Sequence, residues 1–152
     1  MENTNFDSYC AIDISATSVN ITREFTKYSL RGQAKKNYMV LQKDFFDFTS
    51  DDKFDAIIMG EVLEHVENPT MFLDKIYDVA KEDAFIYITT AINAPQPDHI
   101  YHFKTIEDVL KMFADSNMEV VDQIALTANK VSIEKALKKK YAIVVGFVLR
   151  KI

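Results

Sequence analysis

The chain has 152 residues, of which 48% are hydrophobic and 27% charged, a composition typical of one soluble globular domain with its own core. Eighteen Lys and Arg against 23 Asp and Glu give a net charge of −5. This balance argues against nucleic acid as the main partner, because such binding rests on neutralising phosphates. The single cysteine, Cys10, excludes an intramolecular disulfide. The sequence shows no long apolar segment for a membrane and no signal-peptide pattern, so we expect a cytoplasmic protein.

The first half of the chain predicts a strand, a helix and another strand. Residues 1–8 are polar and predict a loose terminus, so the domain itself is expected to span residues 9–152. Apolar residues then recur first at strand spacing and later at near-helical spacing. The expected elements are a strand at Tyr9–Ser15, a helix from Ala16 with Gly32 as its candidate end, a strand at Tyr38–Gln42 and a loop over residues 43–48.

The second half continues with strands and amphipathic helices. Asn68 followed by Pro69 is a typical helix start, because Asn caps the first turn and Pro fits within it. The expected elements are a buried strand at Ala56–Met59, a helix from Pro69 to about Lys81, a strand at Ala84–Thr90, a helix capped by Thr105, and strands at Met118–Leu126 and Tyr141–Leu149 joined by a basic connection that ends at Lys138–Lys140.

This order of elements predicts an α/β fold. Strands separated by helix-sized segments are typical of a mostly parallel, Rossmann-like sheet with helices on both faces. The last two strands follow each other with only a short basic connection between them. We therefore expect them to form an antiparallel pair at one edge of the sheet.

A turn rich in acids follows the central apolar run. Gly60 ends that run, and Glu61, Glu64 and His65 follow at once. If the turn is helical, spacings of three and four residues place these three side chains on one face. Open α/β sheets bind ligands at the carboxyl ends of their strands, so the turn is a candidate site.

Two simpler interpretations of the turn stay open. Acidic residues are also favoured at a solvated helix start, where they meet the positive end of the helix dipole. His65 could instead hydrogen-bond the loop that carries Asp98, or act as a general base, because an imidazole titrates near neutral pH.

The segment from Phe54 to Pro69 resembles the fourth-strand motif of class I S-adenosylmethionine-dependent methyltransferases, in the branch that carries Glu-Val-Leu-Glu-His-Val and includes ubiquinone-type O-methyltransferases. The resemblance runs from about Cys10 to the C-terminus. It implies methyl transfer from S-adenosylmethionine, with an oxygen of a small molecule as the preferred methyl acceptor and either His65 or a bound cation assisting its deprotonation.

The resemblance also implies cofactor-binding residues. Asp13 matches the acid that binds the ribose hydroxyls, and Asp44 with Phe45 matches the end of the third strand, near the adenine. Gly60 and Glu61 match the fourth-strand corner. Asp13 could equally cap the helix that follows it, and Asp44 could be an ordinary surface acid.

A divalent cation is a further implication of the resemblance. In some members, notably small-RNA 2′-O-methyltransferases, a Glu-x-x-Glu-His turn and a later histidine bind a cation that polarises the hydroxyl to be methylated. Matching assigns Glu61, Glu64, His65 and His102 as ligands, with His99 as the alternative to His102. Mg²⁺, Mn²⁺, Fe²⁺ or Zn²⁺ would suit such a set, and each histidine could also be a packed side chain.

The chain departs from the family pattern at its N-terminal side. The family's first strand ends in a glycine-rich turn that approaches the methionine end of the cofactor, and no Gly-x-Gly occurs in this sequence. We therefore expect an N-terminally incomplete fold. Three explanations stay open: a piece of a larger methyltransferase, completion by a homo- or hetero-oligomeric partner that supplies the strand, or a non-catalytic, methyltransferase-like binding or regulatory subunit.

Overall fold

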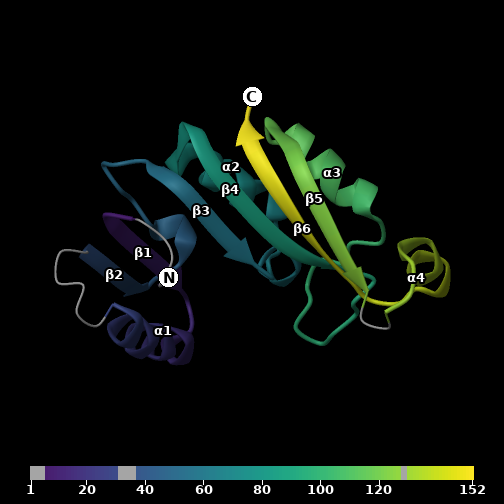
Figure 1. Ribbon diagram of the computed structural model, residues 1–152, viewed down its shortest axis with the longest axis horizontal. Coiled ribbons are helices and arrows are strands. Elements are labelled where there is room, and N and C mark those ends of the chain that lie inside the picture. The colour runs from purple at the N-terminus through teal and green to yellow at the C-terminus, as the bar shows by residue number, and fades with distance from the viewer. Residues whose placement is uncertain (1–5, 31–36, 128–129) are drawn as a thin grey trace. The chain divides into compact units, whose positions relative to one another are not determined.

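The computed structural model describes residues 6–30, 37–127 and 130–152 (Figure 1). These residues form two compact units, Met1–Thr49 and Ser50–Ile152, and each is described by itself. The expectations for residues 1–5 and for a helix end at Gly32 lie outside the described residues. Within the described ranges no helix has the length and apolar character that a membrane span requires.

The first unit is a strand–helix–strand motif. Strands β1 (Ser8–Asp13) and β2 (Asn37–Gln42) pair in parallel, and helix α1 (Ala16–Ser29) connects them. The helix begins where the sequence predicted because Ser15 caps it, its side chain accepting a hydrogen bond from the Ser18 N–H. Nη2 of Arg23 donates to the main-chain oxygen of Val40 at 2.9 Å, which fixes the helix to β2.

The second unit contains a four-stranded sheet in the order β3–β4–β6–β5. Strands β3 and β4 are parallel, and β6 lies between β4 and β5 and is antiparallel to both, so the predicted C-terminal antiparallel pair is confirmed. The elements are β3 (Phe54–Gly60), α2 (Pro69–Val79), β4 (Ala80–Ile92), α3 (Ile106–Asp115), β5 (Met118–Thr127), α4 (Ile133–Lys139) and β6 (Ile143–Lys151), with short 3-10 turns η1 (Phe45–Asp47) in the first unit and η2 (Leu63–His65) in the second.

Helices α2 and α3 cover one face of this sheet, as Figure 1 shows behind the strands. The core lies between them and the sheet, where Phe113 of α3 and Phe147 of β6 meet with ring centroids 5.0 Å apart. The opposite face keeps large apolar side chains in solvent, and Ile58 of β3 is 76% exposed. The second unit therefore has one covered and one open sheet face, and β3, with Ala56 and Ile58 exposed, is not the buried strand that its apolar run predicted.

The structure corrects several predicted boundaries. In the first unit β1 ends at Asp13 rather than Ser15, because Ser15 caps the helix that follows. Helix α2 ends at Val79 rather than near Lys81, because Ala80 already pairs with β3 and Lys81 forms an ion pair with Asp55 of β3 at 2.6 Å. Strand β4 is accordingly longer than the predicted Ala84–Thr90. The last strand begins at Ile143 rather than Tyr141.

The basic connection before the last strand is helical rather than irregular. Ser132 caps α4, its side chain accepting from the Lys135 N–H, and Lys140 ends the helix in the left-handed conformation with φ of 55°. The run of lysines thus lies in the last turn, where cations are favoured by the helix dipole.

The α/β fold with parallel strand pairs is confirmed, and so is its partial character. Among the described residues β1 pairs only with β2, and β3 pairs only with β4. Each of these parallel strands therefore has one edge without a strand neighbour. Parallel strands are ordinarily buried within a sheet, so both edges are unusual places for a sheet to end.

Candidate functional site

The acidic turn begins with a strained residue. Glu61 follows the last residue of β3 with φ of 51°, a left-handed conformation that non-glycine residues rarely adopt. The Glu61 N–H donates to the main-chain oxygen of Thr89 at 3.1 Å and also to its hydroxyl at 3.2 Å. Gly60, which was expected to end the apolar run, is the last residue of β3, and the left-handed conformation falls on Glu61. Strain of this kind is typical of functional sites.

The side chain of Glu64 is buried beneath the turn and is 1% exposed. Its Oε2 accepts a hydrogen bond of 2.8 Å from the hydroxyl of Thr90. Its Oε1 is buried and has no hydrogen-bond partner among the described residues. A buried carboxyl oxygen without a partner is costly, so this atom indicates a place where a hydrogen-bond donor or a cation would be stabilised.

His65 has a defined ring orientation. Its Nδ1 lies 2.9 Å from the main-chain oxygen of Asp98 and 3.7 Å from the carboxylate of the same residue. A carbonyl oxygen only accepts, so Nδ1 carries the hydrogen, and in the neutral ring Nε2 keeps its lone pair. His65 therefore offers Nε2 as a base or a ligand. The expected hydrogen bond from His65 to the Asp98 loop is also present, and it is compatible with that role because it uses the other ring nitrogen.

A third side chain joins this pair. The ring of His99 meets the ring of His65 edge to face, with centroids 4.8 Å apart. One ligand atom from each of Glu64, His65 and His99 lies within 4.8 Å of the others. Ligands about 2.1 Å from a metal lie at most about 4.2 Å from one another, so a small closure would bring these three atoms onto one cation.

The structure brings the predicted cation ligands together only in part. His99, the alternative ligand, lies in the group, whereas the His102 side chain is exposed and lines a groove. Glu61 is not a member of the group, because it precedes the 3-10 turn η2 and does not share its helical spacing. Its carboxyl is nevertheless close enough to Glu64 for their charges to interact.

The pKa of Glu61 is raised above its usual value. Partial burial of the carboxyl is the main cause, a hydrogen bond with Thr89 opposes it in part, and the neighbouring Glu64 carboxylate raises the pKa further. Two carboxyl groups that repel each other favour either a shared proton or a cation between them, which agrees with the unpartnered oxygen of Glu64.

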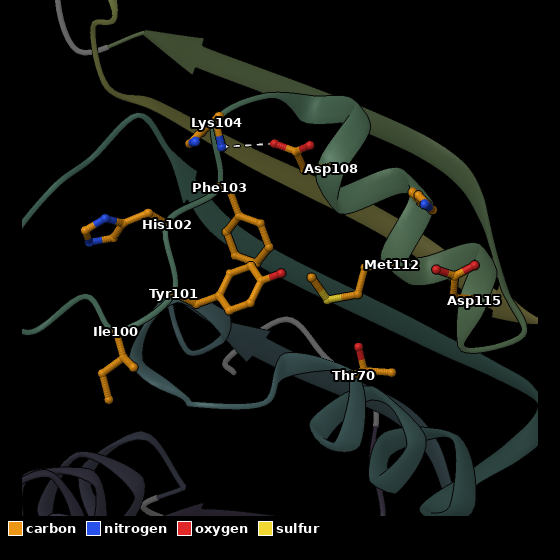
Figure 2. A pocket seen from close by; sticks show the side chains of 10 residues that line it. Thr70, Ile100, Tyr101, His102, Phe103, Lys104, Asp108, Met112 and Asp115 are labelled. Atoms are coloured by element: carbon orange, nitrogen blue, oxygen red, sulfur yellow. Dashed lines mark hydrogen bonds between the residues drawn. The ribbon is translucent and has the colours of Figure 1, made fainter.

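A groove of about 600 Å³ lies beside the turn, between α2 and α3 (Figure 2). The ring centroids of Tyr101 and Phe103 lie 4.8 Å apart, and Thr70 of α2 and Met112 of α3 also line the groove (Figure 2). The Tyr101 N–H donates to the main-chain oxygen of Glu64 at 3.0 Å, so the groove and the acidic turn share a backbone connection.

The cofactor-binding residues expected in the first unit also follow strand ends. Asp13 is the last residue of β1, and its Oδ1 accepts from the Ser15 N–H at 2.7 Å. Ser15 rather than Asp13 caps α1, so the alternative role of Asp13 as the cap is wrong. Asp44 caps η1 after β2, accepting from the Phe46 N–H at 2.9 Å, and Phe45 is half-buried in that turn.

Two residues of this site had no signal in the sequence. Thr89 and Thr90 were expected only as the end of a strand, and the structure places them against Glu61 and Glu64. Only pairing between β3 and β4 brings them there, because 28 residues separate Thr89 from Glu61.

Residues 1–139 match the family described as Methyltransferase domain, and the chain belongs to this family. It is 27% identical over 112 residues to the mitochondrial ubiquinone biosynthesis O-methyltransferase of Dictyostelium discoideum, covering 60% of this chain and 35% of that protein. It is 31% identical over 104 residues to the ubiquinone biosynthesis O-methyltransferase of Glaesserella parasuis, covering 66% of this chain and 43% of that protein. The chain thus spans less than half the length of these relatives.

The fold is similar to that of a solved O-methyltransferase from a trans-AT polyketide synthase multienzyme of Brevibacillus brevis, in complex with S-adenosyl-L-homocysteine. The TM-score is 0.68 at 13% identity, with 93% of this chain and 58% of that chain covered. This likeness confirms the Rossmann-like methyltransferase fold.

Proposed function

We propose that this chain carries part of the active site of an S-adenosylmethionine-dependent methyltransferase that methylates an oxygen of a small molecule. The observation that carries the proposal is that the chain, a member of the methyltransferase-domain family, places acids at the carboxyl ends of parallel strands in each unit: Asp13 and Asp44 at the ends of β1 and β2 in the first unit, and Glu61 after β3 in the second. The carboxyl ends of such strands are where α/β sheets bind ligands.

The chemistry assigns a role to His65. In methyl transfer an acceptor oxygen forms a bond to the methyl carbon as the bond from that carbon to sulfur breaks, and the electron pair stays on sulfur. The hydroxyl proton of the acceptor has to go to a base. His65 is suited to take it, because its Nδ1–H bond to Asp98 leaves Nε2 to accept. A positioned base of this kind typically contributes about 10²–10⁴-fold to a rate.

A divalent cation is the alternative to His65 as the base, because a cation bound to Nε2 would occupy the lone pair that accepts the proton. The unpartnered Oε1 of Glu64 and the nearby nitrogens of His65 and His99 form a carboxylate and imidazole donor set. Such a set with open positions suits Mn²⁺, Fe²⁺ or Zn²⁺ better than Mg²⁺, which prefers oxygen ligands. A cation bound there would act as a Lewis acid on the acceptor hydroxyl.

The methionine end of the cofactor needs residues beyond those in this sequence. No Gly-x-Gly occurs here, and β1 and β3 each have an edge without a strand neighbour among the described residues. We propose that a strand with a glycine-rich turn, from another polypeptide segment, completes the site. Ribose and adenine recognition by Asp13 and Asp44 would then belong to this chain.

Nuclear magnetic resonance of the ¹⁵N-labelled chain tests the proposal. Titration with S-adenosylhomocysteine should shift the amide signals of Asp13, Asp44 and Glu61. The Asp13→Asn variant should bind the ligand more weakly, so that its signals shift only at higher ligand concentration. The amide signals of α4 should stay unchanged as an internal reference. Shifts confined to other regions, or no saturable shift at millimolar ligand, would overturn the proposal.

A further inference from the structure

Two adjacent threonines of β4 contact the two acids of the turn. The hydroxyl of Thr89 accepts from the Glu61 N–H at 3.2 Å, and the hydroxyl of Thr90 donates to Oε2 of Glu64 at 2.8 Å. Successive side chains of a strand point to opposite faces of the sheet, so the adjacent Thr89 and Thr90 contact different residues of the turn. Thr90 is fully buried, and so is the Glu64 carboxyl that it contacts.

The bond from Thr90 leaves the Glu64 carboxylate with one free oxygen. Oε2 is held by the hydroxyl, whereas Oε1 is buried without a partner among the described residues. The carboxylate lies in one group with the nitrogens of His65 and His99. A carboxylate free to rotate could turn either oxygen toward these nitrogens, and the hydrogen bond removes that freedom.

We propose that Thr90 is a positioning residue that orients Glu64 as a single-oxygen ligand for a divalent transition-metal cation shared with His65 and His99. This inference rests on the cation-assisted methyl transfer proposed above. Partners that orient a metal ligand in this way typically contribute 10–100-fold to metal affinity. Thr90 itself touches neither the cation nor the substrate.

Calorimetric titration of the full 152-residue chain with Mn²⁺ alone tests this role. Thr90→Val keeps the shape of the side chain but removes the hydroxyl, and it should weaken Mn²⁺ binding about 10–100-fold. Thr90→Ser restores the hydroxyl and should restore affinity. Thr26→Val is a matched control, because Thr26 is also fully buried and its hydroxyl has no hydrogen-bond partner among the described residues.

Each outcome decides a separate point. Equal Mn²⁺ affinity of wild type and Thr90→Val would overturn the positioning role and leave the cation site standing. A loss that Thr90→Ser fails to restore would also overturn it, because the hydroxyl would then not be the cause. If wild type binds no Mn²⁺, the cation site and this inference both fall, whereas the cofactor proposal is decided by the S-adenosylhomocysteine titration. Thr90→Ala replaces Thr90→Val if the valine variant unfolds.

Discussion

The Nδ1 atom of His65 lies 2.9 Å from the main-chain oxygen of Asp98, a residue 33 positions further along the chain. This bond joins the turn after β3 to the loop after β4, and it fixes which ring nitrogen of His65 is free. The same loop brings His99 against His65. Two loops that follow neighbouring parallel strands thereby build one cluster at their carboxyl ends.

The two histidines of this loop should behave differently. His99→Ala should weaken Mn²⁺ binding by at least about 10-fold, because it removes one of three ligand atoms that lie within 4.8 Å of one another. His102→Ala is the matched control and should leave the affinity unchanged, since His102 is exposed in the groove. Electron paramagnetic resonance of free Mn²⁺ measures both. A loss of Mn²⁺ affinity in His102→Ala but not in His99→Ala would show that His102 is the ligand.

The stability of the chain should carry a pH signature of Glu61. Its pKa in the folded chain is raised by burial, with the Glu64 carboxylate adding to the shift, so folding favours the protonated form. The protonated Glu61 carboxyl therefore adds stability that is fully present below its ordinary pKa of 4.5. This added stability is lost as the pH rises through the raised pKa of the folded chain. The free energy of unfolding of wild type relative to Glu61→Gln should therefore fall with rising pH over this window. Urea titrations at several pH values measure it, and a difference that rises instead would contradict the assignment.

Gly146 should not tolerate a side chain. A Cβ at this position of β6 would lie 2.5 Å from the hydroxyl oxygen of Tyr87 and 3.1 Å from its Cζ. Gly146→Ala should therefore destabilise the second unit by about 1–3 kcal/mol. Adding Tyr87→Phe removes the closest atom and should recover part of the loss. Thermal unfolding of the single and double variants tests this, and additive losses would show that the two residues do not interact.

The start of α3 depends on a reciprocal cap. Thr105 accepts from the Asp108 N–H at 3.1 Å, and Asp108 accepts from the Thr105 N–H at 2.9 Å. Thr105→Ala should lower the free energy of unfolding by about 1 kcal/mol, because a helix N–H loses its partner. Thr105→Ser keeps the cap and should stay near wild type. A serine variant as unstable as the alanine variant would show that packing, not capping, explains the loss.

Sequence patterns were sufficient where local chemistry decides the structure. The helix starts at Asn68 and Thr105 follow from capping side chains, and the order of strands and helices follows from apolar spacing. The start of α1 was predicted from apolar spacing, but its cap is Ser15 and not Asp13. The end of α2 was misplaced because the strand pairing of Ala80 outweighed the helical pattern that runs to Lys81. Helix α4 was missed although Ile133, Ala136 and Leu137 stand at helical spacing, because it is only seven residues long and its lysines were interpreted as a connection.

The site residues could be predicted from the sequence only where they lie close to one another along the chain. Glu61, Glu64 and His65 were found as one motif, and a later histidine was expected from the resemblance. The choice of His99 over His102 depends on the course of a loop that contains two prolines, and the roles of Thr89 and Thr90 depend on pairing between distant strands. Neither leaves a pattern in the local sequence.

The central claim is that this chain holds the adenosine half of a methyl-transfer site and not its methionine end. Calorimetric titration with S-adenosylmethionine and with 5′-methylthioadenosine, which lacks the methionine end, tests it most directly. We predict that both bind within about tenfold of each other, a difference below about 1.4 kcal/mol, and that Asp13→Asn weakens both. No heat from either ligand at millimolar concentration, or binding of S-adenosylmethionine more than about tenfold tighter, would contradict the claim.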